Sequence, residues 1–588
     1  MVNKTIKKTS SLLNHGMGIC LLLLLVYLVQ PALLHATIGK TNTPAKGFKF
    51  DYYRWPYPLH TEVNARLKAL EKKYPKLART IVIGKSEKGR PLTVIEITNH
   101  DTGPAETKPA LWLDANIHAG EITGRQYMMY FIERILFEYG KNPDVTQMVD
   151  TRTFYVLPVF DADGGERVLT HHPAWPGHIP EEHAGKDLDG DGYIMTMRVK
   201  DDSREDGYRY YVEGLDVKSQ WSMGRRGGQA RRDPLTGIRE ETDFNRNWSS
   251  EWEPDERGAG PYPFSQQEVR AVADFITSNL NIFFVYSIHS GGGDGEGRSY
   301  LVRPPMDHPY DTMHHEDNDW YVRAGATWSH LSGGMIIENN YYSFLFNTSR
   351  EDEKGNQIGY SDTMAGFMDD FIYSHVGLHC VLPEISGSGK DYNGDGYVIP
   401  SEVKRWHKEE MGNKFSHPWK SYNHPQLGQV EIGGERIPPA LGERMKFDCE
   451  AQFHWLLYVA DQSALLRIID LKSEPVSGGR LCIKATVQNQ GWLATYVTRN
   501  AIKIKRDYPA IAKIQVSGAK VVKGSETKGL GHILGKHAFI RYWVQGEDRS
   551  KKDVEWTIEP TGSGSIKVTV EAMSPKGGSD KKAITIKK

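Results

Sequence analysis

Cysteine is scarce in this chain, which has four cysteines among 588 residues. One of them, Cys20, lies in an apolar N-terminal run, which leaves Cys380, Cys449 and Cys482 further along the chain. An odd and sparse set does not describe a disulfide framework, although one bridge would fit an oxidising compartment. The fold is therefore not expected to depend on a set of disulfides.

An excess of charge of one sign is also missing, since the formal net charge is −1 at pH 7. With 39% hydrophobic and 25% charged residues, the composition is that of a globular protein with room for more than one domain. The balance gives no indication of a nucleic-acid partner. It hides an asymmetry, however, because residues 465–588 carry 23 Lys and Arg against 11 Asp and Glu. A solvated basic face is the common explanation, and an anionic partner surface is the alternative.

The apolar run at the N-terminus, Met17 to Val29, is shorter than the roughly 20 residues that a membrane-spanning helix needs. Three lysines precede this run, and smaller residues follow it up to Ala36, which is the pattern of a secretory signal peptide. We therefore expect residues 1–36 to be a signal peptide and residues 37–47 a polar lead. The mature protein would be secreted, periplasmic or extracellular, without stable membrane insertion. An anchor that is not cleaved is the alternative.

A histidine and a carboxylate lie three residues apart where a predicted strand turns into a helix. The apolar run that ends at Ile117 is typical of a buried strand, and apolar positions from Met128 to Tyr139 repeat at helical spacing. His118 and Glu121 lie between them, at the carboxyl end of the strand, where open α/β sheets place their sites. Such a pair suits zinc, although the pair alone would also fit a polar surface turn.

A third zinc ligand is expected from another strand end. Ile282 to Ile288 is a run rich in β-forming residues, with His289 at its tip and a glycine-rich loop after it. Its alternative is a buried histidine satisfied by the backbone. A further buried strand, Leu378 to Leu382, brings Glu384 near its tip. The sequence therefore predicts one Zn²⁺ held by His118, Glu121 and His289.

Two acidic, glycine-containing stretches resemble calcium loops. The first, DLDGDGYIMTMR, has Asp187, Asp189 and Asp191 at alternate positions but Arg198 at position twelve, where a glutamate is wanted, so calcium there stays open. The second, DYNGDGYVIPSE, fits the whole pattern. Its expected Ca²⁺ ligands are Asp391, Asn393, Asp395, the Tyr397 carbonyl and Glu402.

Taken together, these motifs resemble the zinc carboxypeptidase family related to carboxypeptidase A. The resemblance runs from about Phe48 to Ala460 and rests on four motifs in the family's order. They are HxxE at His118 and Glu121, NRNW at Asn245 to Trp248, IHS at Ile288 to Ser290, and Glu384. The resemblance implies an α/β fold with a mixed twisted sheet flanked by helices, a single Zn²⁺, and release of residues from the C-termini of peptides or proteins.

The resemblance also implies roles for individual residues. Glu384 would be the general base, and Asn245 with Arg246 would bind the terminal carboxylate of the substrate. Asp243 would orient a zinc-bound histidine. An arginine between the first two motifs would stabilise the oxyanion, with Arg198 as the first choice and Arg167 as its competitor.

Two further residues would shape the substrate site. Tyr360 is the best-placed tyrosine to close over the substrate. Asp369 would lie at the floor of the specificity pocket and favour C-terminal Lys or Arg. With the alignment moved by one residue, Met368 would take that place and favour apolar residues.

From about Leu465 the pattern changes to period-two strands separated by glycine-rich turns, as in Leu481 to Val487 and Ile566 to Val570. We expect a catalytic domain over residues 48–464 and an Ig-like β-sandwich over residues 465–588. A long polar region, about residues 164–240, shows no clear periodicity and is expected to be a loop at the rim of the cleft. Besides a carboxypeptidase, the sequence leaves open a zinc amidase or deacylase acting on cell-wall peptides, and a non-catalytic surface binding protein.

Overall fold

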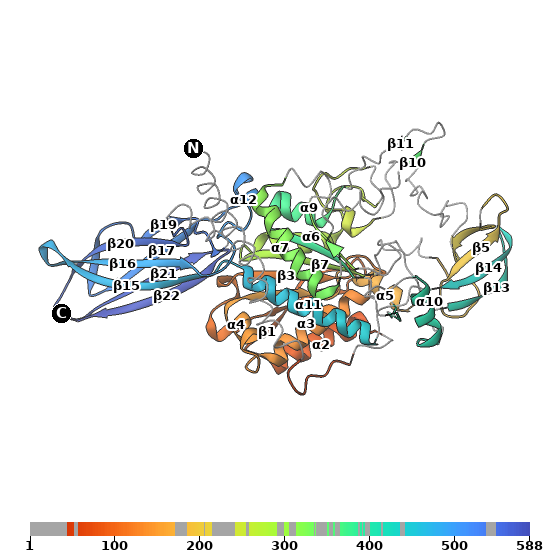
Figure 1. Cartoon of the computed structure of the whole chain (residues 1–588), viewed down its shortest axis with the longest axis horizontal. Helices are drawn as coiled ribbons and strands as arrows, with labels where there is room; N and C mark the ends of the chain where they lie inside the picture. Colours follow the sequence, from red (N-terminus) through yellow and green to blue (C-terminus); the bar gives the residue numbers. More distant parts are fainter. Residues whose placement is uncertain are drawn as a thin grey trace, which may run out of the picture. The chain divides into compact units, whose positions relative to one another are not determined.

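The computed structural model describes most of the chain from residue 44 onward (Figure 1). The described ranges are 44–51, 57–170, 185–204, 206–214, 242–254, 258–290, 299–304, 313–333, 335–336, 350–351, 357–358, 365–385, 389–390, 392–393, 400–412, 416–435, 442–536 and 548–587. The predicted signal peptide, Tyr360, Asp391, Asp395 and Tyr397 lie outside them.

An eight-stranded mixed sheet forms the centre of the catalytic part. Its strand order is β1-β2-β4-β3-β7-β12-β8-β9. The strands are β1 (Ala78–Lys85), β2 (Pro91–Ile97), β4 (Thr153–Leu157), β3 (Ala110–Ala115), β7 (Ile282–Ser290), β12 (His379–Ile385), β8 (Tyr300–Val302) and β9 (Met335–Ile336). The four strands β4, β3, β7 and β12 run parallel, and β1 and β2 pair antiparallel with their neighbours. At the other edge β8 pairs antiparallel with β12 and parallel with β9. This confirms the predicted α/β class with a mixed sheet.

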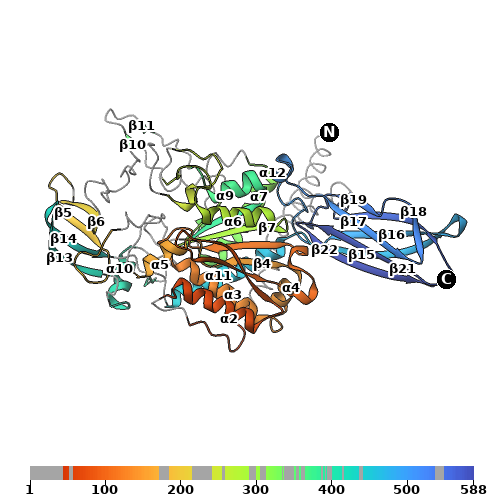
Figure 2. The ribbon, with the colours of Figure 1, turned by 180° about the vertical axis from the view of Figure 1, so that it is seen from behind.

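Helices cover both faces of this sheet because its central strands are apolar on both sides. On one face Trp112 of β3 contacts Phe275 of α6 (Gln267–Ser278), with ring centroids 5.3 Å apart. On the other face Phe284 of β7 contacts Trp455 of α11 (Gly442–Gln462) at 5.9 Å. Figure 2 shows α3 (Thr123–Glu138) beside α11. Helices α2 (His60–Lys73), α4 (Pro143–Thr151) and α7 (His315–Ser332) complete these layers.

Part of the region expected to be a long loop forms a small antiparallel sheet instead. Its order is β13-β14-β5-β6, with β5 (Thr196–Lys200), β6 (Tyr208–Val212), β13 (Ser416–His424) and β14 (Gly428–Glu435). Most of helix α5 (Ala162–Thr170) also lies in that region. The expectation of an irregular loop was therefore wrong for these residues, because their partner strands come from more than 200 positions further along the chain.

The C-terminal residues form two four-stranded antiparallel sheets around a common apolar core, as the period-two pattern predicts. The sheet orders are β15-β16-β20-β18 and β19-β17-β21-β22. The strands are β15 (Leu466–Val476), β16 (Arg480–Asn489), β17 (Ala510–Ser517), β18 (Ala519–Lys523), β19 (Thr527–Gly531), β20 (Lys551–Pro560), β21 (Ile566–Ser574) and β22 (Gly578–Ile586). A short helix, α12 (Arg499–Lys503), lies between β16 and β17.

The three downstream cysteines, Cys380, Cys449 and Cys482, are buried free thiols, so the structure contains no disulfide between them. Among the residues described above, none of the helices combines the length and the apolar character that crossing a membrane requires.

Candidate metal centre and active site

The turn after β3 brings the first two predicted ligands to the edge of the sheet. It begins at Asn116, whose φ of 64° is a left-handed conformation that asparagine adopts more readily than most residues. The Asn116 side-chain amide donates hydrogen bonds to the carbonyl oxygens of His118 and Ala119, at 2.7 and 3.3 Å. This turn is therefore held by a buried side chain before α3 starts at Thr123.

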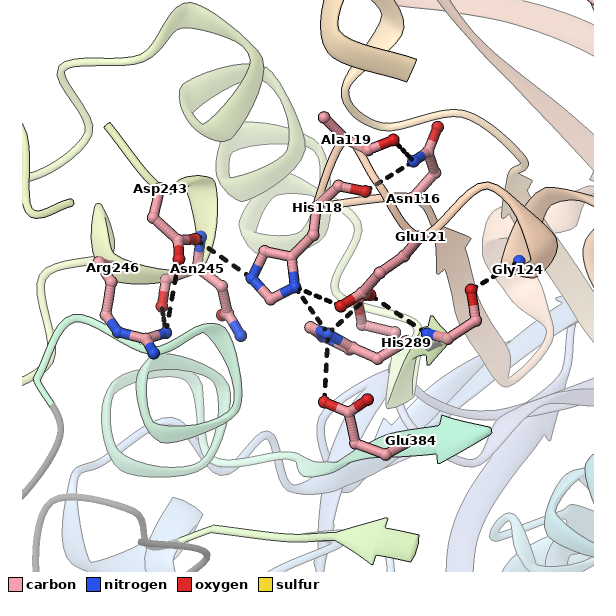
Figure 3. A network of polar contacts seen from close by, with 12 residues as sticks. Asn116, His118, Ala119, Glu121, Gly124, Asp243, Asn245, Arg246, His289 and Glu384 are labelled. Atoms are coloured by element: carbon pink, nitrogen blue, oxygen red, sulfur yellow. Dashed lines mark hydrogen bonds and ion pairs between the residues drawn. The ribbon is translucent and has the colours of Figure 1, made fainter. Parts of the chain in front are cut away.

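The three predicted ligands meet in one cluster (Figure 3). His118 Nδ1 lies 2.8 Å from Glu121 Oε1, and His289 Nδ1 lies 3.1 Å from Glu121 Oε2. The two Nδ1 atoms are 3.1 Å apart. The Ser290 backbone N–H also donates to Glu121 Oε2, at 3.2 Å. Segments 171 residues apart thus converge on one point, as the sequence predicts.

This donor set fits a zinc ion. Two imidazole nitrogens facing each other at 3.1 Å repel unless a proton or a cation lies between them. Tetrahedral zinc with ligand distances of about 2.0–2.2 Å sets its ligand atoms about 3.3–3.5 Å apart. The observed separations of 2.8–3.1 Å come close to that spacing. The two histidines are buried and the carboxylate is partly buried, so the ligand atoms are largely shielded from bulk solvent.

The charges around the cluster reinforce the same conclusion. Burial raises the pKa of Glu121, but the charges of His118 and His289 outweigh it and bring that pKa to about 2. Burial lowers the pKa of His118, but the carboxylates of Glu121 and Asp243 outweigh it and leave it well above the usual range. The protein therefore surrounds this point with negative charge that favours a cation.

Glu384 lies beside the cluster because of strand register. It is paired directly with His289 across the parallel strands β12 and β7. Its Oε1 is 3.7 Å from His289 Nδ1, and the residue is 8% exposed. Burial, followed by the charge of Glu121, raises the pKa of Glu384 to about 7. A carboxyl group with such a pKa can accept and release a proton near neutral pH.

In Figure 3 the NRNW segment lies on one side of His118, and Glu121 and His289 lie on the other. Asp243 Oδ1 is 3.2 Å from His118 Nε2, so this carboxylate fixes the ring and leaves Nδ1 facing the cluster. Asp243 also accepts the Asn245 backbone N–H at 2.7 Å. The Arg246 guanidinium lies 4.0 Å from the centre of the Phe367 ring, and its side chain is 15% exposed.

The segment leading into helix α9 (Met368–Phe371) packs against NRNW. The Met368 backbone N–H donates to Asn245 Oδ1 at 3.0 Å, and the Trp248 N–H donates to the Gly366 carbonyl at 3.1 Å. Asp369 and Met368, the two alternatives for the pocket floor, are both fully buried in the first turn of α9. The structure thus brings both of them near the predicted carboxylate-binding residues.

Arg198 is held by residues of the small sheet. Its Nε donates to Glu431 at 2.8 Å in the small sheet, and its guanidinium lies 3.9 Å from the ring centre of Trp419. A guanidinium held in this way does not support the oxyanion role that was predicted for it, because pairing of β5 with β14 fixes its location. The competitor Arg167 lies on α5. Five further arginines between the first two motifs lie outside the described ranges, namely Arg225, Arg226, Arg231, Arg232 and Arg239.

The carboxylates of the two calcium-like stretches have different surroundings. In the first, Asp187 and Asp189 approach Glu213, which follows β6 and accepts backbone N–H groups of Leu188, Asp189 and Met195. A carboxylate from the end of β6 thus lies beside these two aspartates, whereas Arg198 is paired with Glu431. In the second, Glu402 is buried and accepts the Tyr392 N–H at 2.9 Å, whereas Asn393 is exposed.

Sequence reasoning missed the residues that support the metal turn. Arg125, on α3, is fully buried and donates from Nη2 to Asn116 Oδ1 at 2.6 Å. Gly165 allows this approach, since a Cβ there would lie 2.2 Å from Arg125 Nη2. An arginine just before the apolar run of α3 was the available signal, but its partner on the preceding turn could not be predicted from spacing.

Comparison with known proteins agrees with this geometry. A sequence model described as zinc carboxypeptidase matches residues 63–191 and 205–411. The chain belongs to the zinc carboxypeptidase family. A second model, described as a domain of unknown function, matches residues 465–585.

Several relatives carry carboxypeptidase names. Carboxypeptidase A6 of Mus musculus is 26% identical over 39% of this chain and 42% of its own length. Mast cell carboxypeptidase A of Mus musculus is 28% identical over 38% of this chain and 42% of its own length. The chain thus spans less than half the length of these relatives. A crystal structure of thrombin activatable fibrinolysis inhibitor is 17% identical, with a TM-score of 0.41, covering 71% of this chain and 77% of that one.

Proposed function

We propose that this protein is a secreted zinc metallocarboxypeptidase that hydrolyses the C-terminal peptide bond of peptides or proteins. The observation that carries the proposal is the convergence of His118, Glu121 and His289, with Glu384 in register beside them. The signal-peptide pattern at residues 1–36 supports secretion, and membership of the zinc carboxypeptidase family supports the reaction class.

In this proposal His118, Glu121 and His289 hold the zinc ion, which when bound lowers the pKa of water and polarises the scissile carbonyl. Glu384 takes a proton from the attacking water on Oε1 or Oε2 and later delivers it to the leaving amine. Its pKa of about 7 suits both transfers. Asp243 keeps His118 in the orientation that the site needs, through the 3.2 Å contact with Nε2.

The substrate carboxylate is assigned to Asn245 and Arg246. The Arg246 side chain lies over Phe367, in a mostly buried position where a guanidinium forms strong, charge-assisted hydrogen bonds to a carboxylate. This feature separates an exopeptidase from an amidase, since a substrate without a terminal carboxylate gains nothing from that arginine.

The test compares a peptide with its C-terminally amidated twin. We expect kcat/KM to be about 10- to 100-fold higher for the free carboxylate, which corresponds to the strength of a charge-assisted hydrogen bond. The matched control is Arg246→Met, which should remove the preference and leave the bound zinc unchanged. Equal rates for both peptides in the wild type would exclude binding of the terminal carboxylate by Asn245 and Arg246, the carboxylate clamp, and would favour the amidase alternative.

Asp369 is the proposed pocket floor, which gives a preference for C-terminal Lys or Arg. Its supporting observation is its place in α9, directly after the Met368 amide that is bonded to Asn245. Rates measured for peptides ending in Arg, Leu and Glu decide this point. A preference for Leu would favour Met368 at the pocket floor.

Calcium binding at residues 391–402 is a further proposal, supported by the loop pattern and by the buried Glu402. Bound Ca²⁺ would brace the segment that follows β12. A calcium-selective chelator should then lower the melting temperature while the zinc content stays constant, and an unchanged melting temperature would argue against it.

A further inference from the structure

The chain between α9 and β12 contains a π-helix, η7 (Ile372–Val376), which ends at Gly377. Wide turns of this kind leave backbone groups that need partners from elsewhere, and they occur frequently at functional sites. On its N-terminal side η7 continues α9, and on its C-terminal side it leads into the strand that carries Glu384. In the chain, η7 therefore connects α9, which packs against NRNW, with the strand that carries Glu384.

Helix α12 of the C-terminal domain supplies those partners. The Asn500 side-chain amide donates to the Tyr373 carbonyl at 2.6 Å, and the Thr498 hydroxyl donates to the Gly377 carbonyl at 2.7 Å. The backbones also approach closely, since a Cβ at Gly377 would lie 2.7 Å from Ala501 Cα. Gly377 has a φ of 80°, so glycine meets both the conformational and the steric requirement here.

Helix α7 also contacts the junction between η7 and α12. Asp317 is 2% exposed and accepts hydrogen bonds from the Arg499 N–H, the Asn500 N–H and the Tyr373 hydroxyl, at 2.7, 3.1 and 3.0 Å. Glu316 accepts two hydrogen bonds from the Arg499 guanidinium, at 2.6 and 3.0 Å. One buried carboxylate thus ties the C-terminal domain, η7 and α7 together.

The opposite end of the α9–η7 segment reaches the substrate site. The Met368 N–H is bonded to Asn245 Oδ1, and the preceding residue, Phe367, lies against the Arg246 guanidinium. A displacement of η7 would therefore move the backbone to which Asn245 and Arg246 are fitted. Glu384 is protected from such a displacement, because its strand is held by pairing with β7.

We propose that the C-terminal domain acts as a brace, in which α12 holds η7 and thereby positions the carboxylate clamp of Asn245 and Arg246. The role of the clamp rests on the proposed function, whereas the brace itself rests on the contacts above. In this view the domain of unknown function contributes to substrate binding through residues that never touch the substrate.

Asn500→Ala tests the brace. This change removes the hydrogen bond to the Tyr373 carbonyl. It does not weaken α12 itself, because alanine has a high helix propensity. The matched control is Asn489→Ala in the same domain, whose amide donates to the Leu493 and Ile533 carbonyls within the sandwich. We expect Asn500→Ala to raise KM for a peptide with a free C-terminus about three- to tenfold, with kcat within twofold of wild type.

The control should lower the melting temperature and leave KM unchanged. Partial unfolding would reduce the apparent kcat instead, so the split between KM and kcat separates positioning from stability. An unchanged KM for Asn500→Ala, or an equal rise in Asn489→Ala, would overturn the proposal.

Hydrogen exchange gives a readout that does not depend on activity. Asn500→Ala should accelerate exchange in residues 372–378 and at the Met368 amide, whereas Asn489→Ala should leave both as in the wild type. Acceleration confined to residues 372–378 would mean that the brace does not reach the clamp, and would overturn the proposal. If the wild type hydrolyses no peptide, the proposed function fails, and the exchange at Met368 still decides the brace.

Discussion

Replacing Asn116 by alanine should weaken zinc binding although Asn116 is not a ligand. The change removes the amide that holds the His118 and Ala119 carbonyls, and it leaves Arg125, fully buried, without its 2.6 Å bond to Oδ1. Losing a hydrogen bond to a buried charged group costs about 1.5–3 kcal/mol. A left-handed φ of 64° costs alanine about 1–2 kcal/mol more. The total is about 2.5–5 kcal/mol.

Part of this cost should appear in the metal affinity. Loss of a group that orients ligands typically weakens metal binding about 10- to 100-fold, which is about 1.4–2.7 kcal/mol. Competition with a chromophoric chelator measures the zinc Kd, and thermal unfolding of the zinc-free protein measures the remainder. The loss in zinc-binding free energy and the loss in unfolding free energy should together equal the total cost of the substitution.

Two substitutions at the same position separate strain from lost contacts. Asn116→Gly removes the amide but relieves the left-handed strain, so it should be less destabilising than Asn116→Ala by about 1 kcal/mol. Asn116→Asp keeps an acceptor for Arg125 but places a carboxylate against the carbonyls of the turn. If Asn116→Ala lowers the melting temperature and leaves the zinc Kd unchanged, the turn does not depend on Asn116 and the reasoning is refuted.

Three other predictions concern the reaction and the pH dependence. Glu384→Gln should lower kcat about 10²- to 10⁴-fold with the zinc content unchanged, as measured by steady-state kinetics and metal analysis; a smaller loss would assign the base elsewhere. Removing zinc with a chelator should abolish hydrolysis, and adding Zn²⁺ back should restore it. Burial lowers the pKa of Lys576 to about 7, from 10.5 for an exposed lysine, so the unfolded chain binds more protons between these values and stability from this group rises with pH. The gain in unfolding free energy from Lys576→Met should therefore be about 2 kcal/mol smaller at pH 9 than at pH 7, and a pH-independent gain would contradict it.

The parts of the site that sequence predicts are those determined by local pattern. Apolar runs that end at a histidine place His118 and His289 at the carboxyl edge of parallel strands, and strand order then brings them together. Glu384 follows the same rule on β12. The mixed sheet, its flanking helices and the period-two strands of the C-terminal domain are local patterns of the same kind, and the structure confirms them.

What sequence could not predict depends on pairing between distant segments. The position of Arg198 between two motifs predicts an oxyanion role, but β5 pairs with β14, and in that pairing its guanidinium contacts Glu431 and Trp419. The order of motifs along the chain indicates the family. It does not predict which strands pair, and so it does not predict where a residue between two motifs lies. The same limit applies to Glu213, which approaches Asp187 and Asp189 from the end of another strand.

Arg125 and Asp317 show the limit most clearly, because each is a charged residue that is almost wholly buried. In a sequence each looks like an ordinary polar residue near the start of its helix, and solvent exposure would be the ordinary expectation. Burying a charge is costly unless it is paired, so each one requires a partner from another segment. For Arg125 that partner holds the metal turn, and for Asp317 it is the C-terminal domain. A buried charge outside the catalytic motifs is therefore the feature that points to the supports of a site, and it becomes visible only when the fold shows what it is paired with.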